Sequence, residues 1–286
     1  DVGVGGPNFG ASAVPSLKQF IRDIARSVPS PKGGTVYDVW KKTSDLAKRN
    51  EAQNPGNVRR SNAESTDVKV GDLGSGSDYT AFLQHQGVPS TDIGSGGPYG
   101  VYHSVFDNYA WFKKFADPTF VYEQQMARVL GLQVLRMAQA DVLPYDYEQY
   151  GKEVGEFLAA AQKRIQEGNW TEQVDFGAAV KAAQHFENAG KNLASVQQTI
   201  PANPAKLNRA LLSAERALLD PEGLPNRPFF RHTIFAPGEY TGYAAVVIPG
   251  INEGIDKKDP ARVREQLAKA TAALDRAAAV LEGGAR

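Results

Sequence analysis

In the second half of the chain, apolar residues recur at the spacing of one helix face. This spacing predicts helices over residues 146–166, 174–198, 204–219 and 260–281. In the last of these, Asp259 and Pro260 supply a cap and a first-turn residue, and the pair Gly283 and Gly284 supplies a stop. Its apolar stripe consists of Val263, Leu267, Ala270, Leu274, Ala277 and Leu281. Successive amphipathic helices of this kind are typical of an antiparallel helical bundle.

The first half of the chain alternates glycine-rich loops with helical and strand-like segments. Apolar spacing predicts helices over residues 14–28, 36–49 and 120–140. The polar stretch 50–66 is typical of an exposed loop. Residues 71–93 predict a glycine turn, a helix capped by Asp78 and a short strand that contains Val88 and Ile93. Together these elements indicate an α/β scaffold that carries functional loops.

Residues 220–250 interrupt the helical pattern. They contain five prolines and an aromatic cluster made of Phe229, Phe230, Phe235, Tyr240 and Tyr243. A free linker does not carry so much apolar surface. We therefore expect this docking segment, residues 220–250, to pack against a folded surface.

Composition narrows the possible chemistry. The 286 residues include 32 Lys and Arg and 32 Asp and Glu, so the formal net charge is zero, which gives nucleic-acid binding little electrostatic support. The chain has no cysteine, so thiolate catalysis, Cys-ligated zinc and disulfides are excluded for it. Any metal ion must therefore be bound through His, Asp or Glu.

His103 is the first candidate for such a ligand. It lies in the stretch GPYGVYHSVFDNY, residues 97–109, between an irregular glycine- and proline-containing loop and a segment with helical spacing. Ser104 is expected to cap a helix there, whose apolar face would consist of Val105, Phe106, Tyr109 and Phe112. A histidine at a helix mouth can be a metal ligand, but a lone histidine is more often structural. The residues alone leave both interpretations open.

Several longer motifs together resemble one family. They are LGSGSDYTAFLQHQGVPS (73–90), YGVYHSVFDNYAWFKKFADPTFVY (99–122), VLPYDYEQY (142–150), AERALLDPEGLPNRPFFRHTIFAP (214–237) and YAAVVIPGI (243–251). In this order the chain resembles the glutamate carboxypeptidase II family, which consists of M28-type dinuclear zinc peptidases related to the transferrin receptor. The resemblance implies that residues 1–143 are the C-terminal part of an α/β peptidase domain, a mixed sheet with flanking helices. Residues 144–286 would be an all-α helical domain that forms a homodimer.

The resemblance also implies metal ligands. Asp1 matches a strand-end aspartate and His103 matches the histidine of the Tyr-His-Ser motif, and in the family these two residues bind different zinc ions of a pair. We therefore expect the two side chains to face one cleft. The family's bridging aspartate, first histidine and Glu-Glu pair would precede Asp1, so we expect a fragment that lacks the general base and is inactive alone. The transferrin receptor branch has lost its zinc ligands, so Asp1 and His103 favour the peptidase branch.

On the substrate side, the resemblance implies binding residues Ser75, Gly76, Ser77, Tyr102 and Tyr243. The alternatives are that Ser75–Ser77 form a simple tight turn and that Tyr102 only packs. Where the glutamate-specific family member has two arginines and a lysine, this chain has Asp92, Gly94 and Gly242. Recognition of a terminal glutamate needs such cations, so we do not expect glutamate specificity.

The remaining histidines indicate no metal site. His85 and His185 are expected on helix surfaces, and His232 within the docking segment.

The resulting hypothesis is a zinc-dependent M28-type exopeptidase, a carboxypeptidase or an aminopeptidase, that acts on small peptides or acylated amino acids. It would be extracytoplasmic and would need the upstream part of the same polypeptide. The alternative is a non-catalytic, transferrin receptor-like dimerisation or binding module.

Overall fold

The computed structural model describes residues 3–53, 67–168 and 170–286, and within 46–53 it describes the backbone alone. The chain forms two compact units. The first unit comprises residues 1–12, 18–71 and 93–139, and the second comprises residues 13–17, 72–92 and 140–286. No helix in the described ranges is both long and apolar enough to cross a membrane.

The first unit contains most of a two-stranded sheet and the helices of the N-terminal half. Its elements are β1 (Asn8–Ala13), α1 (Pro15–Ser27), α2 (Val36–Gln53), β2 (Thr91–Gly96), the short α4 (Tyr109–Trp111) and α5 (Val121–Ala138). The apolar face of α1 is buried, with Ile21 and Ile24 fully covered. Phe9 of β1 meets Trp40 of α2 edge to face, with ring centroids 5.0 Å apart. The helices predicted over 14–28, 36–49 and 120–140 therefore form close to their expected bounds.

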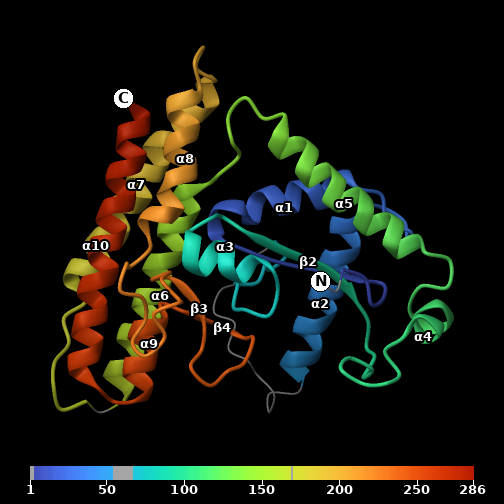
Figure 1. Cartoon of the computed structure of the whole chain (residues 1–286), viewed down its shortest axis with the longest axis horizontal. Coiled ribbons are helices and arrows are strands. Elements are labelled where there is room, and N and C mark those ends of the chain that lie inside the picture. The colour runs from blue at the N-terminus through green and yellow to red at the C-terminus, as the bar shows by residue number, and fades with distance from the viewer. Residues whose placement is uncertain (1–2, 54–66, 169) are drawn as a thin grey trace. The chain divides into compact units, whose positions relative to one another are not determined.

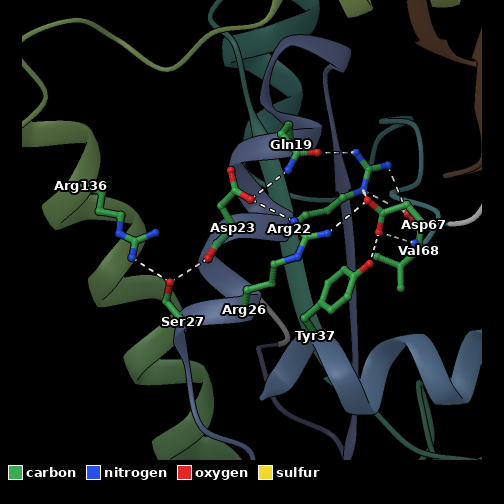
Figure 2. A network of polar contacts seen from close by, with 9 residues as sticks. All are labelled: Gln19, Arg22, Asp23, Arg26, Ser27, Tyr37, Asp67, Val68 and Arg136. Carbon is green, nitrogen blue, oxygen red and sulfur yellow. Dashed lines mark hydrogen bonds and ion pairs between the residues drawn. The ribbon is translucent and has the colours of Figure 1, made fainter. Parts of the chain in front are cut away.

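Asp67 joins α1 to α2 in the first unit through the network shown in Figure 2. Its carboxylate lies 3.6 Å from Nε of Arg22 and 3.3 Å from Nη2 of Arg26, and it accepts a hydrogen bond from the Tyr37 hydroxyl. Burial alone would raise the pKa of Asp67, but the hydrogen bonds from Tyr37 and the Val68 amide and the charges of the two arginines lower it. The network fixes the chain after Asp67 to α1, and its charges pair internally.

The second unit contains the predicted helical bundle, whose long helices lie side by side in Figure 1, and also includes the segment 72–92. Its elements are α3 (Tyr79–Gln86), α6 (Tyr147–Glu167), α7 (Gly177–Thr199), α8 (Ala205–Ala217), β3 (Phe235–Pro237), β4 (Ala245–Val247), α9 (Pro249–Asp256) and α10 (Pro260–Ala285). Helix α10 packs on α7, α8 and α9, and α6 packs on α7 and α9. The stripe predicted for α10 is buried in this bundle.

Local signals explain where α10 starts and how closely α6 and α7 pack. The Asp259 side chain accepts a hydrogen bond from the amide of Arg262 at 3.0 Å, which confirms the predicted cap of α10. A Cβ on Gly151 of α6 would come within 2.5 Å of the α7 backbone at Glu187. Only glycine permits this separation, so α6 and α7 pack backbone to backbone there.

The docking segment packs against a folded surface, as predicted, and that surface lies within the second unit. Ile234 and Phe235 are fully buried, and the amides of Arg231 and His232 donate hydrogen bonds to the carbonyl of Gln84 on α3. Strands β3 and β4 then form an antiparallel hairpin in which Phe235 pairs with Val247 and Pro237 pairs with Ala245. The segment is thus part of the bundle's core.

Three sequence predictions differ from the structure. The strand predicted to contain Val88 begins only at Thr91, because the Val88 amide still bonds to Phe82 at the end of α3. No helix begins at Ser104; its hydroxyl accepts from the Phe106 amide in a turn. Helix α9 was not predicted, since its two glycines weaken the helical signal.

Most of the polar stretch 50–66 lies outside the described residues. Its first residues, up to Gln53, extend α2. The domain boundary expected after residue 143 stays a prediction.

Candidate functional site

Two segments that the sequence analysis assigned to substrate binding meet in the second unit. The amide of Ser75 donates a hydrogen bond to the Tyr243 carbonyl at 3.0 Å. A Cβ on Gly76 would lie 2.6 Å from Cδ1 of the Tyr243 ring. Gly76 also has a φ of +97°, a backbone conformation that favours glycine. The glycine is therefore required both by its turn and by the tyrosine ring that covers it.

Ser77 lies at the start of α3, next to this contact. Its carbonyl accepts hydrogen bonds from the amide and the hydroxyl of Thr80, at 3.0 and 2.8 Å. These bonds close the first turn of α3 and hold the segment 75–77 at the helix N-terminus. Asp78 is the N-cap residue, but its side chain makes no capping hydrogen bond.

Tyr79 adds a hydroxyl to the same place, which the sequence analysis did not anticipate. Its hydroxyl donates to the Ser75 carbonyl at 3.3 Å. Burial, and then the charge of Asp92, raise the pKa of Tyr79 to about 12. At neutral pH the hydroxyl keeps its proton and can act as a hydrogen-bond donor. Asp92 therefore brings a negative charge near the Tyr79 hydroxyl.

The tyrosines of the β3–β4 connection, residues 238–244, reach into solvent. The side chain of Tyr243 is 59% exposed and that of Tyr240 is 86% exposed. Gly242 supports the turn with a φ of +62°, and a Cβ there would meet no atom within 4 Å. The hairpin therefore presents the accessible ring of Tyr243 beside Gly76, a surface that can contact an apolar group of a ligand.

His103 and Tyr102 belong to the first unit. Both side chains are exposed, and their rings stack with centroids 3.8 Å apart at an interplanar angle of 22°. His103 has a φ of +62°, which is uncommon for a residue other than glycine. The apolar helix face predicted after His103 does not form. Two of its residues, Val105 and Phe106, are 86% and 67% exposed instead of packing on a core.

The metal pair cannot be assembled from the described residues. Asp1 lies outside them, so the expected proximity of Asp1 and His103 stays a prediction. Within the ranges 3–53, 67–168 and 170–286, no group of three or more His, Asp or Glu residues is placed to hold a metal ion. His103 supplies an exposed imidazole, but it is not part of such a group of three, so the described residues do not fit a zinc site on their own.

The other histidines have structural partners. His85 is half-buried rather than a free surface residue, and its ring stacks on Phe229 with centroids 4.8 Å apart. His185 is exposed on α7 between two carboxylates of α10. His232 is fully buried in the docking segment, as its predicted role requires. The assignment of these three histidines to non-metal roles agrees with their contacts.

Comparison with known proteins identifies the helical part of the chain. Residues 171–282 match the family model of the transferrin receptor-like dimerisation domain. This range runs from just before α7 almost to the end of α10. It includes the docking segment and the hairpin that carries Tyr243.

Similarity to curated proteins extends over almost the whole chain. A probable glutamate carboxypeptidase, LAMP1 of Arabidopsis thaliana, is 33% identical over 99% of this chain and 40% of its own length. The aminopeptidase NAALADL1 of Rattus norvegicus is 27% identical over 95% of this chain and 38% of its own length. An inactive zinc metalloprotease of Schizosaccharomyces pombe is 23% identical over 97% of this chain. The chain thus spans about 40% of the length of the first of these relatives.

Proposed function

This chain belongs to the family of the glutamate carboxypeptidases and transferrin receptor-like proteins, and from that premise we propose that it is part of an M28-type zinc exopeptidase. The substrates would be small peptides or acylated amino acids. One observation carries the assignment of the pocket: Tyr243 of the matched dimerisation domain covers Gly76 and accepts a hydrogen bond from Ser75. Activity is a property that we assign to the complete polypeptide and not to this chain alone.

In this proposal Ser75, Gly76, Ser77, Tyr102 and Tyr243 bind substrate. Gly76 lets the Tyr243 ring lie close to its backbone, and that exposed ring would contact an apolar side chain of the substrate. His103 would be a zinc ligand with Asp1 as a ligand of the second ion, and this role rests on the resemblance of their sequence contexts. The described residues do not form a zinc site by themselves, so further ligands would come from the rest of the polypeptide.

The charge around the pocket supports a substrate other than a terminal glutamate. Burial, and then the charge of Asp92, raise the pKa of Tyr79, whose hydroxyl donates to the Ser75 carbonyl, so Asp92 places a negative charge near this loop. A carboxylate in the substrate would be repelled there, whereas a neutral or apolar residue would not. Relatives include both a glutamate carboxypeptidase and aminopeptidases by name, so the direction of cleavage is left to the assay.

The test is a peptidase assay of the complete polypeptide with zinc. We expect hydrolysis of small peptides or N-acyl amino acids, and we expect Tyr243→Ala to raise KM about tenfold with the dimer intact. This chain assayed alone should be inactive. An unchanged KM in the Tyr243 variant would refute the assignment of the pocket.

The second candidate is a non-catalytic dimerisation or binding module. It is favoured by the similarity to a fission yeast protein that is named an inactive zinc metalloprotease. The same assay decides between the two: a complete polypeptide that binds zinc but hydrolyses neither peptides nor acylated amino acids would support this second candidate.

We also propose a homodimer through the helical domain and an extracytoplasmic location for the complete polypeptide. The match to a dimerisation domain supports the dimer. The α10 stripe is buried inside its own bundle, so other residues of the domain would form the contact. An interface of this obligate kind buries roughly 2,000 Å² or more. Sedimentation as a monomer at micromolar concentration would contradict it.

A further inference from the structure

A charge network in the second unit holds the hairpin that carries Tyr243. Its centre is Glu253 of α9, whose side chain is 6% exposed. Glu253 receives Nη2 of Arg227 at 2.5 Å on Oε1 and Nη2 of Arg262 at 2.9 Å on Oε2. Both arginine side chains are also largely buried, at 15% and 10% exposed. The carboxylate is therefore charge-paired on both oxygens and fixed in position.

The same residues bind the hairpin backbone directly. Oε1 of Glu253 accepts a hydrogen bond from the amide of Glu239 at 3.1 Å, and Nη1 of Arg227 donates to the carbonyl of Pro237 at 2.6 Å. On the other strand, the side-chain amide of Asn252 donates to the Val247 carbonyl at 2.7 Å. The end of β3 is thus attached to the Glu253–Arg227 ion pair, and the end of β4 is attached to Asn252 of α9. The attachment on β3 lies close to the turn that leads to Tyr243.

Outside the Glu253 network, the turn is attached through the Tyr243 carbonyl, which accepts a hydrogen bond from the Ser75 amide at 3.0 Å. Within the turn, hydrogen bonds join Gly238, Thr241 and Ala244 to one another. Lys257 adds an ion pair to Glu239 at 2.6 Å, but the lysine is 39% exposed, so solvent weakens this pair. The position of Tyr243 over Gly76 therefore depends on the attachment of the hairpin at Glu253 together with the Ser75–Tyr243 hydrogen bond.

We propose that Glu253 is a positioning residue for substrate binding, acting with Arg227 and Arg262 to hold Tyr243 against the Ser75–Gly76 turn. This inference rests on the proposed function, because it takes the tyrosine as part of the substrate pocket. Glu253 would not touch substrate; it would fix the hairpin that does. Its loss would let the ring move, and displacement of a binding group by even about 1 Å can cost a large factor in binding or rate.

The test combines a structural and a kinetic measurement. In this chain, hydrogen–deuterium exchange of residues 238–244 should rise about tenfold in Glu253→Ala and less in Glu253→Gln, which keeps one acceptor oxygen. Exchange in α6 and α7 should not change. In the complete polypeptide, Glu253→Ala should raise KM about tenfold with kcat within about twofold, and Glu253→Gln should restore part of the affinity.

Glu265→Gln is the matched control, because Glu265 lies on α10, is 60% exposed and pairs with Lys269 at 3.5 Å. It should change neither exchange nor KM. If Tyr243→Ala raises KM but both Glu253 variants leave KM and hairpin exchange unchanged, the positioning role is wrong and the proposed pocket stands. If exchange rises throughout the bundle in Glu253→Gln, the residue serves general stability and the inference is overturned.

If Tyr243→Ala leaves KM unchanged, the proposed pocket fails. The inference about substrate positioning then fails with it, even where the exchange data show that Glu253 holds the hairpin.

Discussion

His232 Nε2 lies 2.8 Å from Oε1 of Glu215, and both side chains are completely buried. Nδ1 of the same imidazole accepts hydrogen bonds from the amides of Ile234 and Phe235, each at 3.2 Å. Since Nδ1 accepts, the ring proton is on Nε2 and is donated to the carboxylate. The same Glu215 oxygen also accepts the hydroxyl of Tyr150 at 2.6 Å. One carboxylate therefore links α6, α8 and the docking segment.

We predict that Glu215→Ala destabilises the second unit by about 3–5 kcal/mol, because it leaves two buried donors without an acceptor and opens a cavity. Glu215→Gln should lose less stability, since the carbonyl oxygen of its side chain can still accept a hydrogen bond. Urea unfolding followed by circular dichroism measures both. A loss below about 1 kcal/mol in the alanine variant would show that the linkage contributes little.

A second prediction concerns the glycine under Tyr243. Gly76→Ala should displace the ring as well as strain the turn, because its φ is +97° and the new Cβ would lie 2.6 Å from the ring. Gly242→Ala is the matched control: its φ is +62°, but the added Cβ meets no atom within 4 Å. Both variants carry the backbone strain of about 1–2 kcal/mol. In urea unfolding of this chain Gly76→Ala should lose more stability, and in the complete polypeptide it alone should raise KM. Equal effects of the two variants would contradict the contact.

A third prediction tests the substrate charge preference. In the complete polypeptide, kcat/KM should be higher for substrates with a neutral or apolar terminal residue than for those ending in glutamate. Asp92→Arg should shift the ratio of the two kcat/KM values toward glutamate by about tenfold. The variant replaces a carboxylate that repels the substrate's carboxylate with a guanidinium that can pair with it. Asp78→Arg makes the same charge change at the exposed N-cap of α3 and should shift the ratio little. A native preference for terminal glutamate would contradict the interpretation of the pocket.

The helical half of the fold was predictable because its signals are local and agree with one another. The α10 stripe, its Asp259 cap and its Pro260 first turn all specify the same helix, and the bundle then buries the stripe. The segment after Ser104 shows the opposite case. Its apolar residues have helical spacing, but spacing forms a helix only where a core covers that face, and Val105 and Phe106 are exposed.

The candidate site was predictable only in part. Family motifs selected Gly76 and Tyr243, and the structure brings them into contact. No motif or periodicity indicated Glu253, because an ion pair between a helix and a distant hairpin depends on the tertiary fold and leaves no regular spacing in the sequence. Tyr79 was missed for a related reason: its raised pKa comes from burial and from Asp92, and neither can be seen in the residue itself.

The last prediction concerns pH. His185 of α7 lies between Glu282, at 2.9 Å from Nε2, and Asp275, at 3.4 Å from Nδ1, both on α10. The hydrogen bond to Glu282, with a smaller contribution from Asp275, raises the pKa of His185 against the opposing effect of burial. Because the pKa of His185 is higher in the folded state, the charged imidazolium stabilises the fold, and this stabilisation is complete below the pKa that His185 has in the unfolded chain. It is lost as the pH rises through the folded-state pKa.

The free energy of unfolding of wild type should therefore exceed that of His185→Gln at about pH 5, and the difference should shrink toward zero at about pH 9. The effect should be small and should weaken with added salt, since the histidine side chain is 45% exposed. His85→Gln serves as the control, because its Nδ1 faces the uncharged carbonyl of Phe229 at 3.0 Å. Urea unfolding at the two pH values, and at low and high salt, measures how the difference in free energy of unfolding between wild type and each variant depends on pH and on salt. A difference that is constant with pH would mean that packing, and not the charged imidazolium, accounts for whatever His185 contributes between α7 and α10.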